Sequence, residues 1–504
     1  MLTTSRYYQL MQDYAEGLSL FALGCIVFCT QVLTVAAQPA PIGSSKAVLL
    51  VSDRPLVRAI NSGEKHSYRI EATAGQYLRV KVEQQGIDLT VTLTSPAGVE
   101  LTVDRETRTQ GSETISAITE TDGIYTLRVA PSSKRGVGKY EVRIEQLRAA
   151  SEEDKNRVAA ETELAETEHL RSRADDGESL RNAIKKSEHA LAMFRSLNDS
   201  AGEAAALGLL GGFYADLRDK QRSLDYFGQA LTLEQALGNR AGEAGILDTL
   251  GRVYDYAGER QLALETLNKA LPLMRAVGNW KGEQDVLMNL GWVYERLGDP
   301  RKALVYFKAV LSACHANGRQ SCEAFAVISI AGTYTSMGEK FQALAHYRRA
   351  LILHRGMNSL RGQAYTFHDM AWLFATMGRY QDALKYNYRA LPLMRQSGDP
   401  GGEAYVLNGI GSTYASLGQI SEAIRYFNLT LLLRRSAGDR NGEAETLYNL
   451  ADCERRRSNL AAARAYVESA LTIVESLRTK VGSENLRASF TGTRQESYDL
   501  LMMC

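Results

Sequence analysis

The hydrophobic pattern of this chain is a forty-residue unit that recurs seven times without insertion between Ala201 and Lys480. In the copy Gly401–Arg440, a first helix is predicted by apolar and small residues at helical spacing, namely Ala404, Leu407, Ile410, Gly411 and Tyr414. The same spacing predicts a second helix from Ile420, Ala423, Ile424, Phe427 and Leu431. Gly418 and Gly438 follow these helices and are expected to end them, because glycine adopts the left-handed conformation easily. Each copy is therefore predicted to be a helical hairpin.

A lone hairpin cannot bury its apolar stripe, so the copies are expected to stack into an α-solenoid whose first helices line a concave face. Glycine opens six copies, at Gly202, Gly242, Gly282, Gly362, Gly402 and Gly442. Two copies depart from the pattern, because Cys322 replaces the opening glycine and Asn387 stands where other copies have Phe227, Phe307 and Phe427. Asp299-Pro300 and Asp399-Pro400 are predicted helix starts, with aspartate as the cap and proline at the first helical position.

The columns of the unit resemble the tetratricopeptide repeat in its longer, forty-residue form. The resemblance rests on Leu210, Leu250, Leu290, Ile330, Met370, Ile410 and Leu450, each followed by Gly or Ala, and on the columns of Tyr, Gly and Ala that most copies share in register. It covers residues 201–480, which is more than half of the chain. The predicted fold class is therefore mainly α, a solenoid of helical hairpins, with a small antiparallel β-sandwich in front of it.

Residues 1–37 are predicted to be a signal peptide or a membrane anchor. Leu18 to Val35 is apolar enough to enter a membrane, and Val35-Ala36-Ala37 resembles a small-residue cleavage site. Arg6 is the sole basic side chain before this stretch, so uncleaved anchoring stays open beside export. The expected location is periplasmic or extracellular, with anchoring by residues 18–35 as the alternative.

Residues 38–55 are predicted to be a linker, and residues 56–148 a β-sandwich. Polar and apolar residues alternate over 66–70, 77–82 and 89–93, which predicts strands. Turn signals separate them at residues 61–63, 74–75, 96–98, 122–123 and 136–138. The runs 63–68, 86–89, 96–98 and 123–127 resemble the bacterial pre-peptidase C-terminal (PPC-like) β-domain, which implies a binding or spacing role without catalysis.

Residues 149–200 are predicted to be a helical linker and a degenerate capping repeat. The segment from Ala149 to Arg173 is strongly charged, as expected of a helix that leaves the sandwich. Ala183, Ala190 and Asn198 match the columns of the second helix, so this region is expected to cap the array.

Charge and cysteine content narrow the possible functions. The 504 residues contain 59 Lys plus Arg and 58 Asp plus Glu, so no net field favours nucleic acid as a partner. The arginines at 434–435 and 455–457 sit near predicted helix C-termini, where they complement the helix dipole. Cys314 and Cys322 could approach each other across the turn between copies, but free buried thiols are the favoured interpretation.

Catalytic and metal-binding patterns are not found in the sequence. The seven histidines show no metal-ligand spacing, and Asp88 and Asp104 are favoured as turn-capping residues over calcium ligands. No nucleophile elbow or phosphate-binding glycine loop occurs, and the glycines follow the repeat. We therefore expect a protein that is not an enzyme, with no catalytic residue, metal or cofactor.

The candidate binding residues lie at first-helix positions that the hairpin does not need for its own packing. From the fifth, eighth, ninth, twelfth and sixteenth positions of the copies come Arg252, Asn289, Trp292, Arg296, Tyr365, His368, Asp369, Trp372, Tyr405, Asn408, Asn449 and Asp452. Amides bond extended backbones and aromatic rings anchor side chains, so a peptide or protein segment is the expected partner. The alternative is that Trp292 and Trp372 pack between neighbouring copies.

Residues 481–504 are predicted to form a helical tail that resembles the segment leading into a caspase-like CHAT peptidase domain. The family's catalytic His and Cys match no position of this sequence. Two hypotheses follow: a non-catalytic scaffold that binds a protein or peptide, or the regulatory half of a CHAT-type peptidase. Nucleic acid is not an expected partner, a membrane is expected to meet only the N-terminal segment, and the sequence leaves the oligomeric state open.

Overall fold

The structure is a computed structural model that describes residues 48–52, 54–103, 110–132, 137–171, 177–217 and 219–479. The predicted leader, the predicted C-terminal tail and Asp104 lie outside these residues. The chain divides into two compact units, one ending at Val286 and the other beginning at Leu287. None of the helices within the described ranges is both long and apolar enough to cross a membrane.

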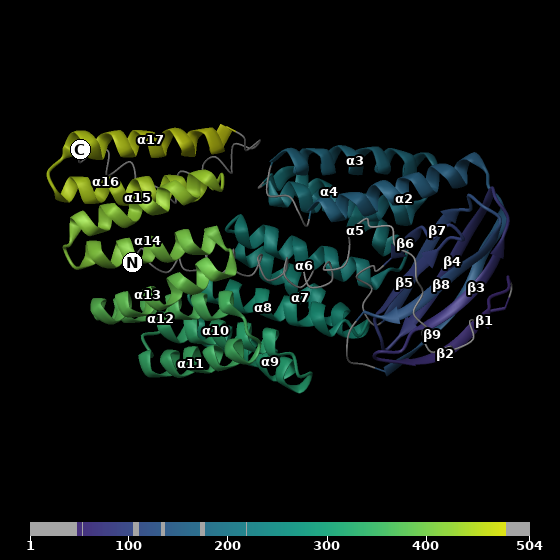
Figure 1. The fold of residues 1–504 in the computed structure, drawn as a ribbon, viewed down its shortest axis with the longest axis horizontal. Coiled ribbons are helices and arrows are strands. Elements are labelled where there is room, and N and C mark those ends of the chain that lie inside the picture. Colours follow the sequence, from purple (N-terminus) through teal and green to yellow (C-terminus); the bar gives the residue numbers. More distant parts are fainter. Residues whose placement is uncertain are drawn as a thin grey trace. The chain divides into compact units, whose positions relative to one another are not determined.

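The first unit begins with strands arranged in two sheets (Figure 1). The strands are β1 Val48–Leu49, β2 Leu56–Asn61, β3 His66–Ala72, β4 Gln76–Gln85, β5 Leu89–Thr94, β6 Glu100–Val103, β7 Gln110–Ile118, β8 Gly123–Pro131 and β9 Val137–Ala149. One sheet has the order β1-β3-β8-β5-β6 and the other has the order β2-β9-β4-β7. The predicted strands at 66–70, 77–82 and 89–93 are confirmed as parts of β3, β4 and β5.

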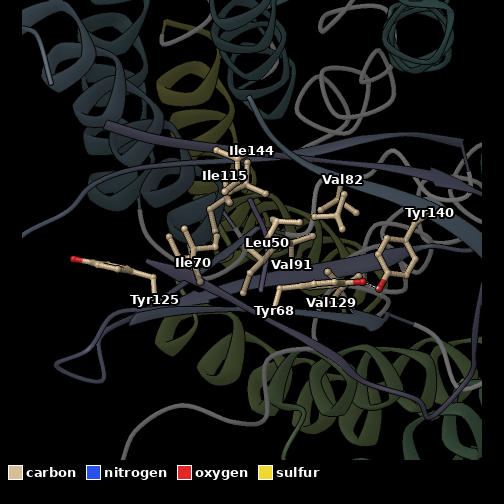
Figure 2. Packing of buried hydrophobic residues seen from close by; sticks show 14 of the residues in the cluster. Leu50, Tyr68, Ile70, Val82, Val91, Ile115, Tyr125, Val129, Tyr140 and Ile144 are labelled. Atoms are coloured by element: carbon tan, nitrogen blue, oxygen red, sulfur yellow. Dashed lines mark hydrogen bonds between the residues drawn. The ribbon is translucent and has the colours of Figure 1, made fainter. Parts of the chain in front are cut away.

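Apolar side chains from both sheets fill the space between them. In β4, Leu78, Val80 and Val82 alternate with polar residues and are fully buried in this core. Figure 2 shows the packing of Tyr68 and Tyr140, whose hydroxyl groups are hydrogen-bonded at 2.5 Å. The core contains residues of both sheets, so the two sheets form one sandwich.

Two details of the sandwich differ from the prediction. β1 pairs with β3 in parallel, whereas every other strand pairing is antiparallel. The predicted turn at 136–138 is wrong at its end, because β9 begins at Val137 and Gly138 pairs with Ile60. A Cβ atom on Gly138 would lie 2.4 Å from Ile87 and 2.6 Å from the carbonyl oxygen of Gln85. This glycine therefore serves close approach inside the sheet instead of a turn.

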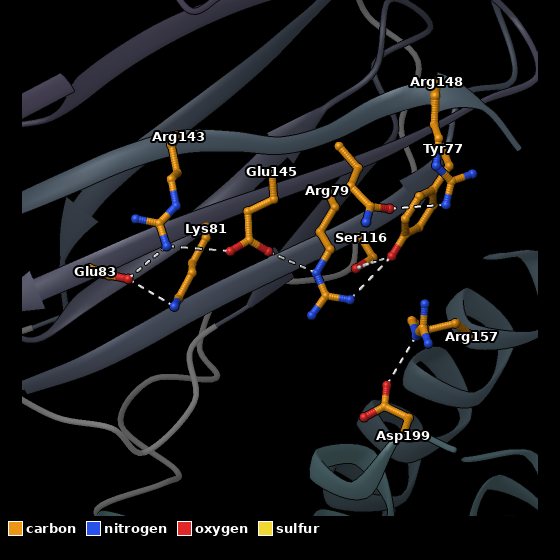
Figure 3. Close-up of polar contacts among 11 residues, drawn as sticks. Tyr77, Arg79, Lys81, Glu83, Ser116, Arg143, Glu145, Arg148, Arg157 and Asp199 are labelled. Atoms are coloured by element: carbon orange, nitrogen blue, oxygen red, sulfur yellow. Dashed lines mark hydrogen bonds and ion pairs between the residues drawn. The ribbon is translucent and has the colours of Figure 1, made fainter. Parts of the chain in front are cut away.

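A cluster of polar contacts connects the sandwich to the first helices. Helix α2, Glu152–Arg171, follows β9 directly, and Arg148 donates hydrogen bonds to Asp154 at 2.5 and 2.9 Å. The guanidinium group of Arg148 lies over the ring of the buried Tyr77 (Figure 3). Figure 3 also shows Arg157 of α2 paired at 3.1 Å with Asp199. The predicted helix after the sandwich is confirmed.

Helix α3, Gly177–Ser196, forms a hairpin with α2 and contacts the first repeat helix, α4 Ser200–Asp216. Ala183 and Ala190 are fully buried in the apolar core that α3 shares with α4 and α5. Asn198 has a positive φ of 50° and ends α3 in the manner of the glycines in later copies. The hairpin therefore occupies the place expected of a capping repeat.

Each of the seven copies forms the predicted hairpin (Figure 1). Beside α4, the first helices are α6 Arg240–Tyr256, α8 Trp280–Arg296, α10 Gln320–Ser336, α12 Leu360–Thr376, α14 Pro400–Ser416 and α16 Arg440–Arg456. The second helices are α5 Lys220–Ala236, α7 Arg260–Ala276, α9 Pro300–Ala316, α11 Lys340–Gly356, α13 Tyr380–Ser397, α15 Ile420–Ser436 and α17 Leu460–Thr479. The mainly α fold class and the repeat solenoid are confirmed.

The predicted helix starts are also confirmed. Asp299 and Asp399 are N-caps whose side chains accept hydrogen bonds from the backbone N–H of Lys302 and Gly402. Pro300 and Pro400 follow them at the start of α9 and α14. These positions lack an intrahelical partner for the backbone N–H, so proline costs nothing there.

The opening glycines mark the joints between successive copies. A Cβ atom added to any of them would come within 1.5–2.6 Å of the side chain eight residues earlier, near the end of the preceding helix. The pairs are Phe194 and Gly202, Glu234 and Gly242, Met274 and Gly282, His354 and Gly362, Met394 and Gly402, and Arg434 and Gly442. Glycine thus leaves room for a side chain of the previous copy, which the sequence pattern did not reveal.

The one copy without an opening glycine closes its joint covalently. Cys314, at the end of α9, and Cys322, at the start of α10, form a disulfide with a Cα–Cα distance of 5.7 Å. The favoured interpretation as free thiols is therefore wrong for this pair. The reason is the joint itself, which brings these two positions into contact in every copy. Cys453 is a free, buried cysteine, and burial raises the pKa of its thiol to about 11.

A second small-residue column lets the two helices of a hairpin approach. A Cβ atom on Gly291 would lie 2.3 Å from the ring of Phe307, and one on Gly411 would lie 2.7 Å from the ring of Phe427. In the copy with Ala371 in this column, the facing residue is Asn387, which is buried and hydrogen-bonded to His368. Where Asn387 replaces the phenylalanine of other copies, Ala371 thus replaces their glycine and His368 supplies a hydrogen bond.

Candidate functional site

The candidate site lies along the first helices of the second unit. There α10 contacts α12, α12 contacts α14, and α14 contacts α16, so these first helices form a row. We call the predicted binding residues on α8, α12, α14 and α16, together with Phe325 of α10 at the fifth position of its copy, the first-helix face. It consists of Asn289, Trp292, Arg296, Phe325, Tyr365, His368, Asp369, Trp372, Tyr405, Asn408, Asn449 and Asp452. Arg252, also predicted, is half-buried on α6 in the other unit.

Trp292 is used for packing between copies. Its side chain is 7% exposed and meets the ring of Phe325 of α10 edge-on, with ring centroids 5.7 Å apart. Asn289, one turn earlier on α8, is also 7% exposed. The alternative interpretation of Trp292 as a packing residue is therefore the better one. Trp372 is half-buried on α12, and Arg296 is half-buried at the end of α8.

Three aromatic side chains from α12 and α14 lie together at the centre of the row. The ring of Tyr405 lies 4.2 Å from the imidazole of His368 and 6.1 Å from the ring of Tyr365. The Tyr365 hydroxyl donates a hydrogen bond of 3.3 Å to Asp399, the N-cap of α14. Burial raises the pKa of Tyr365 to about 12. The sequence pattern correctly placed these rings on one face, and the structure brings them together across two copies.

His368 points into its own hairpin instead of being free to bind a ligand. Its Nδ1 atom is hydrogen-bonded to the side-chain oxygen of Asn387 at 2.8 Å, and the residue is 7% exposed. Gly409 of the next copy covers it, since a Cβ atom there would lie 2.4 Å from the imidazole. Burial lowers the pKa of His368 to about 4, so the ring is neutral at neutral pH.

Asp369 is the acidic residue that α12 contributes to the first-helix face. It is 7% exposed, and burial raises the pKa of its carboxyl group to about 8. Its charge acts on Tyr405, whose pKa is raised first by burial and then by Asp369. Among the described residues, none forms a hydrogen bond or an ion pair with this carboxylate.

The amide side chains of the face connect the last two copies. Asn449 of α16 donates a hydrogen bond of 3.1 Å to the side-chain oxygen of Asn408 of α14. Asp452 forms ion pairs with Arg455 at 2.8 Å and with Arg456 at 2.7 Å. Arg456 also donates to the carbonyl oxygen of Ala415. These contacts leave acceptor and donor capacity on both amides for a bound backbone.

The predicted list missed residues that shape this face. Asn387 and Gly409 fix the position of His368, and only the break in the phenylalanine column hinted at Asn387. A recurring stacked pair between the two helices of a hairpin was also missed. Its members include Tyr214 with Tyr226, Tyr294 with Tyr306, Phe374 with Tyr386, and Tyr414 with Tyr426, at centroid distances of 5.1–5.5 Å. The signal was a second tyrosine column twelve residues after the first.

The groups on the face can form hydrogen bonds, stack on planar groups and attract positive charge. Within the described ranges, no three side chains of His, Cys, Asp or Glu lie close enough together to hold a metal ion.

Comparisons with known proteins find a family match in part of the repeated region. The tetratricopeptide repeat family matches residues 202–276, 243–314 and 402–476. Comparison with curated proteins finds no match.

Several solved structures are similar to this chain. The apo form of the quorum sensor NprR from B. thuringiensis is 16% identical, with 63% of this chain and 88% of that chain covered and a TM-score of 0.47. Aspartyl phosphate phosphatase F from Bacillus subtilis is 15% identical, with 64% and 84% covered and a TM-score of 0.45. A signal transduction ATPase with a tetratricopeptide repeat sensor from Pyrococcus horikoshii is 14% identical, with 70% and 54% covered and a TM-score of 0.41.

Proposed function

Because the helical array of this chain contains tetratricopeptide repeats, we propose that the protein is a non-catalytic scaffold that binds a peptide or an extended protein segment along the first-helix face. The observation that carries this proposal is the contact between face residues of successive copies. Tyr365 meets Tyr405, and Asn408 bonds Asn449, so aromatic and amide groups follow one another along the row. An extended segment would find both an apolar surface and backbone hydrogen-bond partners there.

Export of the protein is a further part of this proposal. The disulfide between Cys314 and Cys322 supports it, because disulfides persist mainly in oxidising compartments. The β-sandwich would then serve as a spacing or binding domain of the PPC-like kind. The alternative, a regulatory half of a CHAT-type peptidase, rests on residues 481–504, which lie outside the described residues.

A selection from a random peptide library tests the proposal. The bait is the chain with a C-terminal tag, and enriched peptides are measured against variants with Trp372→Ala or with Asn408→Ala and Asn449→Ala. We expect these variants to bind at least ten-fold more weakly, because they remove contacts of the face. Phe341→Ala and Ile352→Ala serve as controls on α11, where these side chains are 92% and 67% exposed.

Helix content of every variant is compared by circular dichroism, so that unfolding is recognised. Equal loss of binding in the face variants and the α11 variants would contradict the proposal. A library that yields no binder at all would also contradict it.

A further inference from the structure

An unpaired carboxylate lies among aromatic rings on the first-helix face. Asp369 is 7% exposed, and no described residue gives its carboxylate a hydrogen bond or an ion pair. Buried carboxylates are ordinarily paired, because an unpaired buried charge costs several kcal/mol. The column that contains Asp369 has the neutral Asn289 and Asn449 in other copies, so the repeat does not need an acid there. An ionised carboxylate at this position is expected to lower the stability of the fold, which points to a role in binding.

The surroundings of Asp369 favour positive charge. Burial first, and then Asp369, Tyr365, Glu445 and Tyr347, raise the pKa of Tyr405. Once Asp369 is ionised, it and Glu445 therefore make the electrostatic potential at the Tyr405 hydroxyl more negative. Arg361, which acts on Tyr365, is already paired with Asp399 at 2.6 Å, and Arg434 is paired with Asp439 at 2.7 Å.

We propose that Asp369, with the rings of Tyr365 and Tyr405, forms a subsite for a positively charged arginine or lysine side chain of the bound segment. This inference rests on the proposed function. A carboxylate forms charge-assisted hydrogen bonds with guanidinium or ammonium groups, and aromatic faces attract the same cations. A metal ion suits the site poorly, since calcium takes six or more oxygen ligands and Asp369 supplies two.

Binding at this subsite is coupled to the loss of one proton. In the empty protein the raised pKa of Asp369, about 8, keeps its carboxyl group largely protonated at pH 7. A bound cation favours the ionised form, so the proton leaves when the segment binds. The charged and titratable groups that act on or contact the Tyr405 and Tyr365 rings, besides Asp369, are His368 and Arg361 on α12, Asp399 at the start of α14, Glu445 on α16 and Tyr347 on α11. His368, with a pKa of about 4, stays neutral across this range.

The test is a thermodynamic cycle between peptide and protein. The strongest peptide from the library selection is synthesised with each arginine replaced by citrulline and each lysine by norleucine, which keep the shape and remove the charge. Affinities are measured for the full chain and for Asp369→Asn. At one basic position we expect the neutral peptide to bind the full chain at least ten-fold more weakly and Asp369→Asn less than two-fold more weakly.

Calorimetry at pH 7 in two buffers of different ionisation enthalpy supplies a second measurement. We expect release of close to one proton with the full chain and of none with Asp369→Asn. The subsite is overturned if all basic positions affect both proteins equally, or if the selected peptides contain no basic residue. Those results leave the binding scaffold intact, whereas a selection without any binder removes the scaffold and the subsite together. Glu422→Gln, which removes one charge from the exposed surface of α15, is the matched control.

Discussion

Cys314 of α9 is bonded to Cys322 of α10, at the place where every other joint between copies has a side chain packed on glycine. The disulfide closes a short loop, with a sequence separation of 8 residues. Cross-linking a loop of this size stabilises a fold by about 2–3 kcal/mol, chiefly by restricting the unfolded chain.

We therefore expect a reductant to lower the free energy of unfolding by about this amount, as measured by urea denaturation with and without dithiothreitol. Cys314→Met with Cys322→Gly copies the joint formed by Met394 and Gly402 and serves as the control. Its stability should not depend on the reductant. Equal sensitivity of the two proteins would contradict a structural role for this disulfide.

Gly291→Ala should weaken its hairpin. The added methyl group would lie 2.3 Å from the ring of Phe307, and both residues are buried. Overpacking of this kind costs about 1–3 kcal/mol. Gly245→Ala is the matched change in α6, where a Cβ atom meets nothing within 4 Å, and should stabilise by about 0.5–1 kcal/mol through helix propensity. Urea denaturation of both variants checks the opposite signs, and a stabilised Gly291→Ala would refute the packing argument.

Acid should destabilise the joint at His354. This imidazole is 6% exposed, neither ring nitrogen has a hydrogen-bond partner, and burial lowers its pKa to about 4. The unfolded chain takes up a proton below about pH 6.5, whereas the folded protein does so only near pH 4, so stability falls as the pH drops through this interval.

His354→Met, which copies Met274 and Met394 at the same position of other copies, removes this proton uptake. Between pH 7 and pH 5 we expect the natural chain to lose about 1–2 kcal/mol more than the variant. His189→Gln, at a side chain that is 64% exposed, is the control and should behave like the natural chain. Identical pH profiles for the natural chain and His354→Met would show that the buried imidazole is not the cause.

Asp369→Asn should stabilise the folded chain, and the gain should depend on pH. The pKa of Asp369 is raised in the folded state to about 8, so the fold favours the neutral carboxyl group. The loss of folding stability caused by Asp369 therefore grows as the pH rises above 3.8, the pKa of this group in the unfolded chain. We expect a gain of about 1–3 kcal/mol at pH 7.5 that shrinks toward pH 4. Asp382→Asn, at an exposed ion pair with Arg379, should change stability by less than about 0.5 kcal/mol. A destabilised Asp369→Asn at pH 7.5 would mean that the carboxylate has a partner.

The helices could be predicted from the sequence because the residues that start, line and end them recur from copy to copy. Caps such as Asp399 and the stripe of small and apolar residues recur at fixed spacing, and each copy supports the interpretation of the next. The same spacing could not separate binding from packing positions. Trp292 and Trp372 share a column, yet Trp292 is buried against Phe325 of the next copy, whereas Trp372 is half-buried.

Pairings across the hairpin were equally hidden from the sequence. His368 and Asn387 are nineteen residues apart, and only the packing of α12 against α13 brings them together. The lack of a partner at Asp369 is a property of the folded surroundings, which no local pattern expresses. The β-sandwich also shows that a local pattern can mislead. Gly138 lies in a glycine-rich segment that predicts a turn, yet it is a residue of strand β9.

The pairing of an opening glycine with a side chain of the previous copy has a consequence for how the array comes apart. One joint contains the Cys314–Cys322 disulfide, one contains the buried imidazole of His354, and one contains the thioether of Met394, which does not titrate. A reductant and acid are therefore each expected to weaken a different joint, so the joint that opens first should differ between reducing and acidic conditions.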